Sequence, residues 1–159
     1  MNQSRSRGTT ALEFAIVIAT LLVVIFGILD LSRIVYLRMT LEEGVRRAAR
    51  LAAVCPPGSS LIKKAAVFQD SAAQGAAIPG ATLENVNVVY LNEGGLLADP
   101  LSQFTSVRFV RVSVDGVSLS LFFPFVTGIF APTNISSTTS AESLGVLPAT
   151  GSSVPLPCN

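Results

Sequence analysis

Few side chains in this 159-residue sequence are of the types that perform catalysis. Histidine, the commonest general base and the commonest metal ligand, is absent. The acidic residues after residue 55 show no catalytic, metal-binding or phosphate-binding spacing; they are Asp70, Glu84, Glu93, Asp99, Asp115 and Glu142. We therefore expect no catalytic residue, no metal site and no cofactor, and an enzyme tethered to a membrane is a remote alternative.

Two cysteines, Cys55 and Cys158, are the remaining groups with chemistry of their own. They lie too far apart in the sequence for a CxxC redox or zinc motif. If this part of the chain is exported to an oxidising compartment, a disulfide between them is favoured over two unrelated thiols. Such a bridge would tie the C-terminal tail to the end of a long helix. In the chain-entropy model, a closed loop of about 100 residues contributes roughly 4–5 kcal/mol.

Glu13 stands at the start of a long apolar segment, after a leader that carries Arg5, Arg7 and Gly8. A carboxylate within a membrane is costly and is often functional. The alternative is that Glu13 lies near the membrane surface and reaches water. Both interpretations stay open from the residues alone.

The apolar segment itself predicts a membrane span over residues 9–30. Residues 14–29 have no charge, and about 20 residues suffice to cross a hydrocarbon core of roughly 30 Å. Arg5 and Arg7 favour a cytoplasmic N-terminus and an exported remainder, although arginines also follow the span. A cleaved secretory signal would need small residues at a cleavage site, and Asp30-Leu31-Ser32-Arg33 does not provide one.

Helical periodicity continues past the span to about residue 53. One face is apolar, and it comprises Ile34, Leu37, Leu41, Val45, Ala48 and Ala52. The opposite face is charged and includes the favourable i,i+4 pairs Glu42–Arg46 and Glu43–Arg47. Cys-Pro-Pro-Gly at 55–58 ends the helix. The apolar face packs against the exported domain of the same chain, against neighbouring subunits, or against both.

The rest of the chain predicts an α+β domain over residues 55–147, with a Pro- and Ser-rich tail at 148–159. Residues 61–77 read as a second helix, and residues 86–90, 106–122 and 135–144 read as antiparallel strands, with a possible bend at Gly116. The apolar stretch 121–126 belongs to the core, to a sheet edge, to the membrane surface or to a partner's groove.

Composition agrees with a membrane protein rather than a nucleic-acid-binding one. The net charge is +1, only 13% of the residues are charged, and the mean hydropathy is +0.59. Soluble domains usually carry about 25% charged residues. Nucleic-acid binding would need clustered Lys and Arg on one face, so we expect a lipid bilayer and no nucleic acid among the partners.

Three short stretches carry a resemblance to a known family. They are residues 7–17, with Gly8, Thr9 and Glu13-Phe14-Ala15; residues 26–33, with Phe26-Gly27-Ile28; and the Ala- and Arg-rich residues 46–52. Together they resemble the TadE-like pseudopilins of the tight-adherence (Tad/Flp) pilus. Arg46-Arg47-Ala48 departs from the Arg-Glu-Gly-Ala often found in relatives.

The resemblance implies a role in assembly rather than catalysis. A prepilin peptidase would cut between Gly8 and Thr9, removing leader residues 1–8 and leaving the anchor in place. Glu13 and Phe14 would take part in subunit recruitment, with the Glu13 carboxylate meeting the N-terminal amine of a neighbouring subunit. The implied partners are other pilins and pseudopilins and an inner-membrane assembly platform.

The same features leave a second family open. Pseudopilins of type II secretion systems or of other type IV pili share the processing signal, but they often carry Phe directly after the cleaved Gly, where this chain has Thr9. The residues do not distinguish a TadE type from a TadF type, nor a filament subunit from a component that stays at the base.

Overall fold

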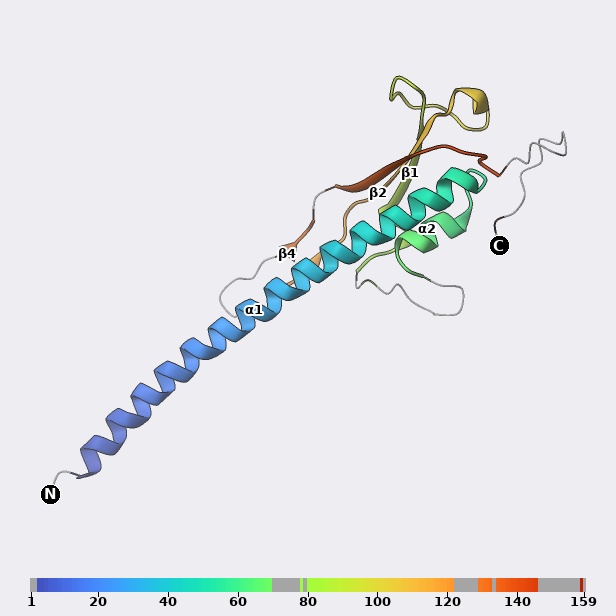
Figure 1. The fold of residues 1–159 in the computed structure, drawn as a ribbon. Coiled ribbons are helices and arrows are strands. Elements are labelled where there is room, and N and C mark those ends of the chain that lie inside the picture. Colours follow the sequence, from blue (N-terminus) through green and yellow to red (C-terminus); the bar gives the residue numbers. More distant parts are fainter. Residues whose placement is uncertain are drawn as a thin grey trace.

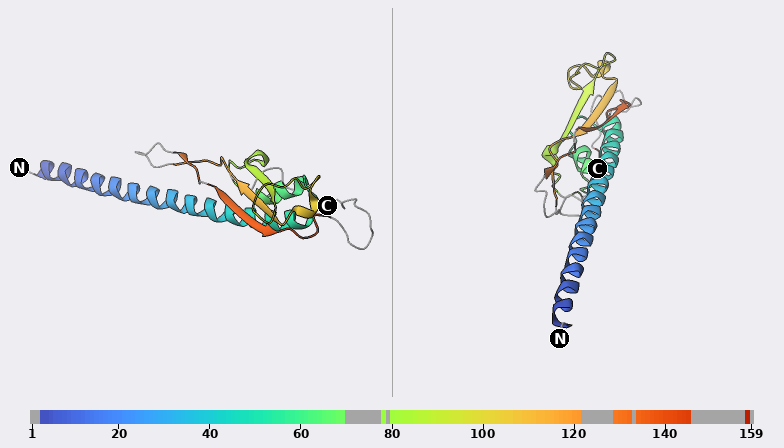
Figure 2. Two further views of the ribbon diagram at one scale, coloured as in Figure 1. Left: turned by 90° about the horizontal axis from the view of Figure 1, so that it is seen from above. Right: turned by 90° about the vertical axis from the view of Figure 1, so that its left-hand side faces the viewer.

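A computed structural model describes residues 3–69, 78, 80–121, 129–132, 134–145 and 158 of this chain. One helix, α1, runs the length of the molecule, and a small domain packs on its C-terminal half (Figure 1). The two views in Figure 2 show the N-terminal half of α1 projecting from that domain. The predicted α+β fold, with a long helix, a second helix and a small antiparallel sheet, is confirmed.

Helix α1 spans Gln3–Val54, 52 residues, or roughly 78 Å at 1.5 Å per residue. It is continuous across the predicted boundary at residue 30, because no proline interrupts it. It begins six residues before the predicted start at Thr9, so part of the basic leader is helical as well. Cys55 and the two prolines that follow end it, as the sequence predicts.

Helix α2 is shorter than the prediction of residues 61–77. It spans Ser60–Ala66, and residues 67 and 68 form a turn. Phe68 has a φ of +54°, a left-handed conformation that an α-helix cannot contain, so the prediction is wrong for residues 67–69. The remainder of the predicted helix, residues 70–77, lies outside the described residues.

A three-stranded antiparallel sheet forms the second layer, in the order β1-β2-β5. Strand β1 is Val86–Leu91, β2 is Phe109–Val114 and β5 is Ile135–Ser140. In the central strand, Val112 lies opposite Val88 on one side and Ser137 on the other. Two 3-10 turns, η1 at Leu83–Asn85 and η2 at Phe104–Ser106, precede β1 and β2.

The predicted strand over residues 106–122 is divided in the structure. After β2, Gly116 adopts a φ of +75°, and the chain enters β3, Leu119–Ser120, which pairs with β4, Ile129–Phe130. The bend that the glycine suggested is thus confirmed, since a positive φ is readily adopted by Gly. β5 ends at Ser140 rather than at residue 144, and the stretch 122–126 lies outside the described residues.

The core lies between α1, α2 and the sheet. The predicted face of α1 is buried from Leu37 to Ala52 and packs on the alternate valines of β2, which are Val110, Val112 and Val114. Strand alternation puts Arg111 on the other face of the sheet, where its Nε donates a hydrogen bond of 3.1 Å to Thr138 Oγ1. The described part of the chain therefore answers one question left open by the sequence: the apolar face of residues 34–52 packs on this chain's own domain.

Candidate functional site

The proposed processing residues, Gly8 and Thr9, both lie in the first turns of α1 and are exposed. A Cβ atom placed on Gly8 would meet no atom within 4 Å, so the described residues leave this part of the backbone uncovered. The side chains of Arg5 and Arg7 lie outside the described residues. Thr9 comes four residues before Glu13, and positions i and i+4 share one face of a helix.

Glu13 and Phe14 point outward from α1, as side chains that a partner could contact. Among the described residues, no salt bridge involves Glu13. The Glu13 carboxylate lies on the surface of α1, beside the exposed apolar side chains of Leu12 and Phe14. A second molecule, or water at the membrane surface, is what could meet it there.

The N-terminal half of α1 is surrounded by none of the described domain. Its most apolar 18-residue window has a mean hydropathy of 2.8 and none of it is buried, and one such helix is found among the described residues. Its exposed large side chains are Leu12, Phe14, Ile16, Val17, Ile18, Leu21, Leu22, Val24, Ile25, Phe26, Ile28 and Leu29. An apolar surface of this extent requires lipid or other apolar helices. These features indicate a single-pass membrane anchor.

Asp30 marks the change from the bare half of α1 to the covered half. Its side chain is buried, and Arg33 Nη1 lies 3.6 Å from Asp30 Oδ1 one turn further along. A buried carboxylate needs a paired charge or hydrogen bonds, and Arg33 contributes the charge. The sequence showed an acid at the end of an apolar run, but it gave no sign that this side chain would be buried.

The solvent face of the covered half carries a short network of ion pairs. Glu42 lies between Arg38, at 3.1 Å, and Arg46, at 3.8 Å. Glu43 pairs with Arg47 at 3.1 Å, and the Arg47 guanidinium also lies over the Phe68 ring, 5.0 Å from its centroid. Both i,i+4 pairs expected from the sequence are confirmed, while the contact of Arg38 and that of Phe68 were not predicted.

Gly44 has a structural role that propensity alone does not show. In isolation, Gly weakens a helix by up to about 1 kcal/mol relative to Ala. Here a Cβ at position 44 would overlap the backbone carbonyl oxygen of Ala66 and would lie 3.1 Å from the Phe68 ring. The glycine therefore lets α2 approach the backbone of α1 closely, and this approach holds the second helix in place.

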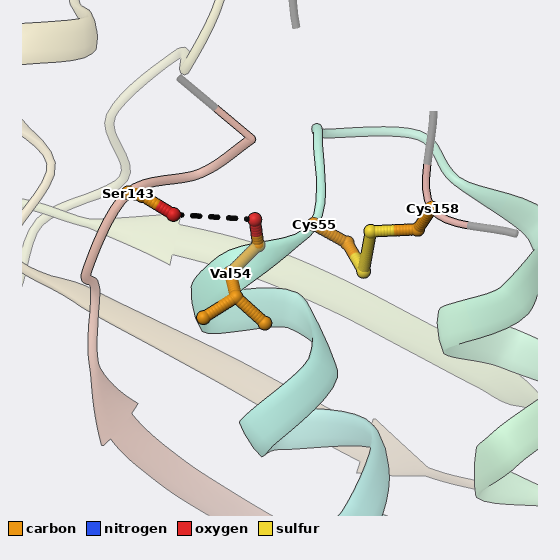
Figure 3. The surroundings of a disulfide bond; sticks show 4 residues. All are labelled: Val54, Cys55, Ser143 and Cys158. Carbon is orange, nitrogen blue, oxygen red and sulfur yellow. Dashed lines mark hydrogen bonds between the residues drawn. A yellow bond between two sulfur atoms is a disulfide. The ribbon is translucent and has the colours of Figure 1, made fainter. Parts of the chain in front are cut away.

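The C-terminal end of α1 is fixed by two other parts of the chain. Cys55 and Cys158 form the expected disulfide, with Cα atoms 5.7 Å apart and a sequence separation of 103 (Figure 3). The segment after β5 donates backbone hydrogen bonds from Glu142 and Leu144 to the Ala53 carbonyl, at 3.1 and 3.2 Å. Ser143 Oγ donates a further one to the Val54 carbonyl, at 3.5 Å (Figure 3). These bonds satisfy carbonyls that a helix end leaves without partners.

Two titratable groups in the domain that packs on α1 have shifted pKa values. Burial raises the pKa of the Tyr90 phenol, because the charged form is poorly solvated in the core. The backbone N–H of Leu101, followed by the Ser102 hydroxyl, lowers the pKa of Asp99 by hydrogen bonding to its carboxylate. No group of three or more acidic or cysteine side chains that could hold a metal ion occurs among the residues the structure describes.

Comparison with known families identifies the same segment. The family model described as TadE-like protein matches residues 8–50, which begin at Gly8 and end in the covered half of α1. The resemblance seen in the residues is confirmed over this segment, which is less than half of the chain. No curated protein and no solved structure matches the chain.

Proposed function

We propose that this chain is a minor pseudopilin that takes part in the assembly of a Tad/Flp-type adhesive pilus. The observation that carries the proposal is that the TadE-like match, residues 8–50, falls on a helix whose N-terminal half is bare. A bare apolar helix can lie in lipid before assembly and among the helices of other pilins and pseudopilins afterwards. The covered half holds the exported domain, which gives the subunit its own surface.

The proposal places the N-terminus in the cytoplasm, the helix in the bacterial inner membrane and the domain outside it. Arg5 and Arg7 support this orientation, because basic residues are retained on the cytoplasmic side. The disulfide between Cys55 and Cys158 supports it independently, because disulfides persist in oxidising compartments. The subunit would then meet the assembly platform from within the same membrane.

In this proposal, a prepilin peptidase hydrolyses the peptide bond between Gly8 and Thr9. The exposed position of Gly8, with no atom near its Cα substituent site, supports access to that bond. Cleavage would give Thr9 a free amine, and the mature chain would keep Glu13 at its fifth position. Within a membrane, a carboxylate and an amine of two subunits neutralise each other where either alone would be unfavourable.

N-terminal sequencing of the full chain from cells with and without the peptidase tests this proposal. We expect Thr9 as the first residue when the peptidase is present and the uncleaved leader when it is absent. A chain that still begins at Met1 in peptidase-positive cells would exclude the pseudopilin function.

The recruitment role of Glu13 is tested separately, by Glu13→Ala with Glu43→Ala as the control. Both carboxylates are exposed on α1, but Glu43 lies on the covered half beside Arg47. We expect Glu13→Ala to abolish incorporation into pilus assemblies while cleavage and membrane insertion persist, and Glu43→Ala to assemble normally. Normal assembly by the Glu13 variant would show that the carboxylate only reaches water.

A further inference from the structure

The loop between β1 and β2 is ordered by its own hydrogen bonds. We call residues 92–104 the leucine loop. Asn92 exchanges two bonds of 2.9 Å with Leu96, through its backbone N–H and its side-chain Oδ1. Asp99 accepts from the Leu101 N–H at 3.0 Å with its carboxylate and from the Gln103 N–H at 2.8 Å with its carbonyl. The backbone of the loop is thus held in one conformation.

This ordered loop holds large apolar side chains in solvent. Leu96, Leu97 and Leu101 are 69%, 75% and 85% exposed. Elsewhere in the exported domain, aliphatic side chains such as Val112 and Leu144 are buried in the core. Large exposed apolar side chains gathered on one hydrogen-bonded loop are candidates for a binding surface. Figure 1 shows the leucine loop, in yellow and gold, at the end of the molecule far from the N-terminus, so it lies away from the membrane anchor.

A groove between α1 and α2 has the complementary composition. It has a volume of about 520 Å³ and is lined by Arg47, Arg50, Leu51, Lys64, Ala65, Phe68 and Gln69. We call it the α1–α2 groove. Its large apolar lining residues are Leu51 and Phe68, which we call its floor. Its cationic lining residues are Arg47, Arg50 and Lys64. Among the described residues, no salt bridge involves Arg50 or Lys64, whereas Arg47 pairs with Glu43.

The two features belong to parts of the chain with opposite net charge. Residues 30–69, which contain the groove, carry seven basic and three acidic side chains. Residues 80–145, which contain the leucine loop, carry two basic and five acidic ones. Within the loop, Glu93 and Asp99 flank Leu96 and Leu97, and both carboxyl groups belong to a side-chain type that is charged at neutral pH. The leucine loop thus combines apolar and acidic side chains, and the α1–α2 groove combines apolar and basic ones.

We propose that the leucine loop of one copy of this chain docks in the α1–α2 groove of a second copy. Leu96 and Leu97 lie on the floor formed by Leu51 and Phe68, and Glu93 and Asp99 face Arg50 and Lys64. The contact depends on the exported domain alone and requires neither cleavage at Gly8 nor any pilus component. It can therefore hold or fail independently of the proposed function.

The placement of the two surfaces sets the kind of assembly. The leucine loop and α2 (green) lie apart on one molecule in Figure 1 and in the right-hand view of Figure 2. Because two different surfaces meet, the contact is heterologous, and each bound copy still offers a free loop or a free groove. Such a contact repeats along an open chain of subunits unless it closes into a ring. A subunit with these surfaces would form short rows along the membrane.

The test uses the uncleaved full chain in liposomes, with a photo-cross-linking amino acid at position 97. We expect cross-linked dimers whose linked peptides map to residues 47–69. Leu96→Ser should lower the cross-linking yield at least about tenfold, since it removes an apolar side chain that the proposed contact buries. High salt should lower the yield as well, because it screens the charged rim.

A charge exchange identifies the partner surface. Glu93→Lys and Arg50→Glu should each lower the yield, and the chain carrying both substitutions should recover it. Glu84→Lys is the matched control, because it reverses an exposed acid outside the leucine loop and should leave the yield unchanged. Absence of dimers, or cross-links to lipid or to residues 8–39 instead of the groove, would overturn the proposal, as would loss without recovery in the exchanged chain.

Discussion

The N-terminal and C-terminal halves of α1 belong to one unbroken helix, yet they lie in opposite surroundings. From Leu12 to Leu29 the large apolar side chains are exposed, and from Leu37 to Ala53 the apolar face is buried under α2 and the sheet. The first half is apolar on all sides, and the second is apolar on one side and charged on the other. The same backbone hydrogen bonding forms both halves, so the secondary structure is identical and only the surroundings of the side chains differ.

The contrast shows that the two halves obtain their stability from different sources. The bare half depends on the membrane, where every backbone polar group must be paired within the helix. The covered half depends on tertiary packing, on the disulfide and on the bonds from the segment after β5. Substitutions in the bare half should therefore affect membrane insertion or assembly, and substitutions in the covered half should affect folding of the domain that packs on it.

Removal of the disulfide is the largest expected effect on the covered half. Cys55→Ser/Cys158→Ser opens a loop of 103 residues, and the chain-entropy model gives a loss of about 4–5 kcal/mol in unfolding free energy. Pulse proteolysis of the full chain in urea measures this loss. Extraction of membranes with carbonate should show unchanged insertion. A variant that no longer inserts would show that the two halves are not independent.

Replacing one leucine by alanine in each half of α1 tests the comparison directly. Leu41 is 1% exposed and Leu21 is 55% exposed, although both lie on the same helix. Leu41→Ala should lower the unfolding free energy of the domain that packs on α1 by about 2–5 kcal/mol, because it leaves a cavity. Leu21→Ala should leave it within about 0.5 kcal/mol of the parent chain in the same proteolysis assay. Equal effects would refute the division of α1 into two halves.

Gly44→Ala sharpens the contrast between helix propensity and packing. In an unpacked helix, this change would stabilise by up to about 1 kcal/mol. At position 44 the new methyl group would overlap the Ala66 carbonyl, so we expect a loss of about 1–3 kcal/mol instead. Gly94→Ala is the control, because its Cβ would meet only Asn92 Oδ1 at 3.4 Å. A stabilised Gly44 variant would mean that α2 does not pack closely on α1.

The smallest expected effect concerns the buried phenol of Tyr90 on β1. Tyr90 Oη is buried and has no hydrogen-bond partner among the described residues, so Tyr90→Phe should be neutral or stabilising by up to about 1 kcal/mol. Burial raises the pKa of Tyr90, so the preference of the folded state for the neutral phenol contributes to stability. This contribution is complete below about pH 10 and is lost as the pH rises through the folded-state pKa.

Alkaline unfolding curves of the full chain measure this dependence. The stability of the parent chain should fall above about pH 10, and Tyr90→Phe should remove part of the fall. Tyr36→Phe, at the exposed second tyrosine, is the control and should keep it. An identical fall in all three chains would assign the alkaline loss to other groups.

Local patterns predicted those elements in which one periodicity dominates. The uncharged run at 14–29 predicted the anchor, and the spacing of Leu37, Leu41 and Val45 predicted the buried face of α1. Alternation over residues 106–122 predicted a strand, and β2 lies within that range. The early end of α2 was not predictable in this way. Phe68 has a left-handed backbone conformation and its ring lies beside Arg47 of α1, a contact between two segments that no local pattern shows.

The residues of the candidate site were chosen from the sequence alone, but the sequence did not predict which parts of the structure surround them. Gly8, Glu13 and Phe14 were found from their order along the chain, and the structure places all three on an exposed helix surface. The leucine loop was missed, although leucines between a Gly-Gly turn and a proline are a signal that could have found it. Burial is a property of the whole domain, and no local pattern states whether a loop leucine is covered.

The sequence by itself determined the continuous helix, its apolar span and the pairing candidates Cys55 and Cys158, and it is the sole basis for the proposed processing residues Gly8 and Thr9. These follow from local spacing, from charge and from the small number of cysteines. Only the tertiary structure decided where the helix passes from bare to covered, why Gly44 is needed beneath Ala66, and which leucines remain in solvent. These depend on contacts between segments far apart in the chain, which form only when the domain folds against the helix.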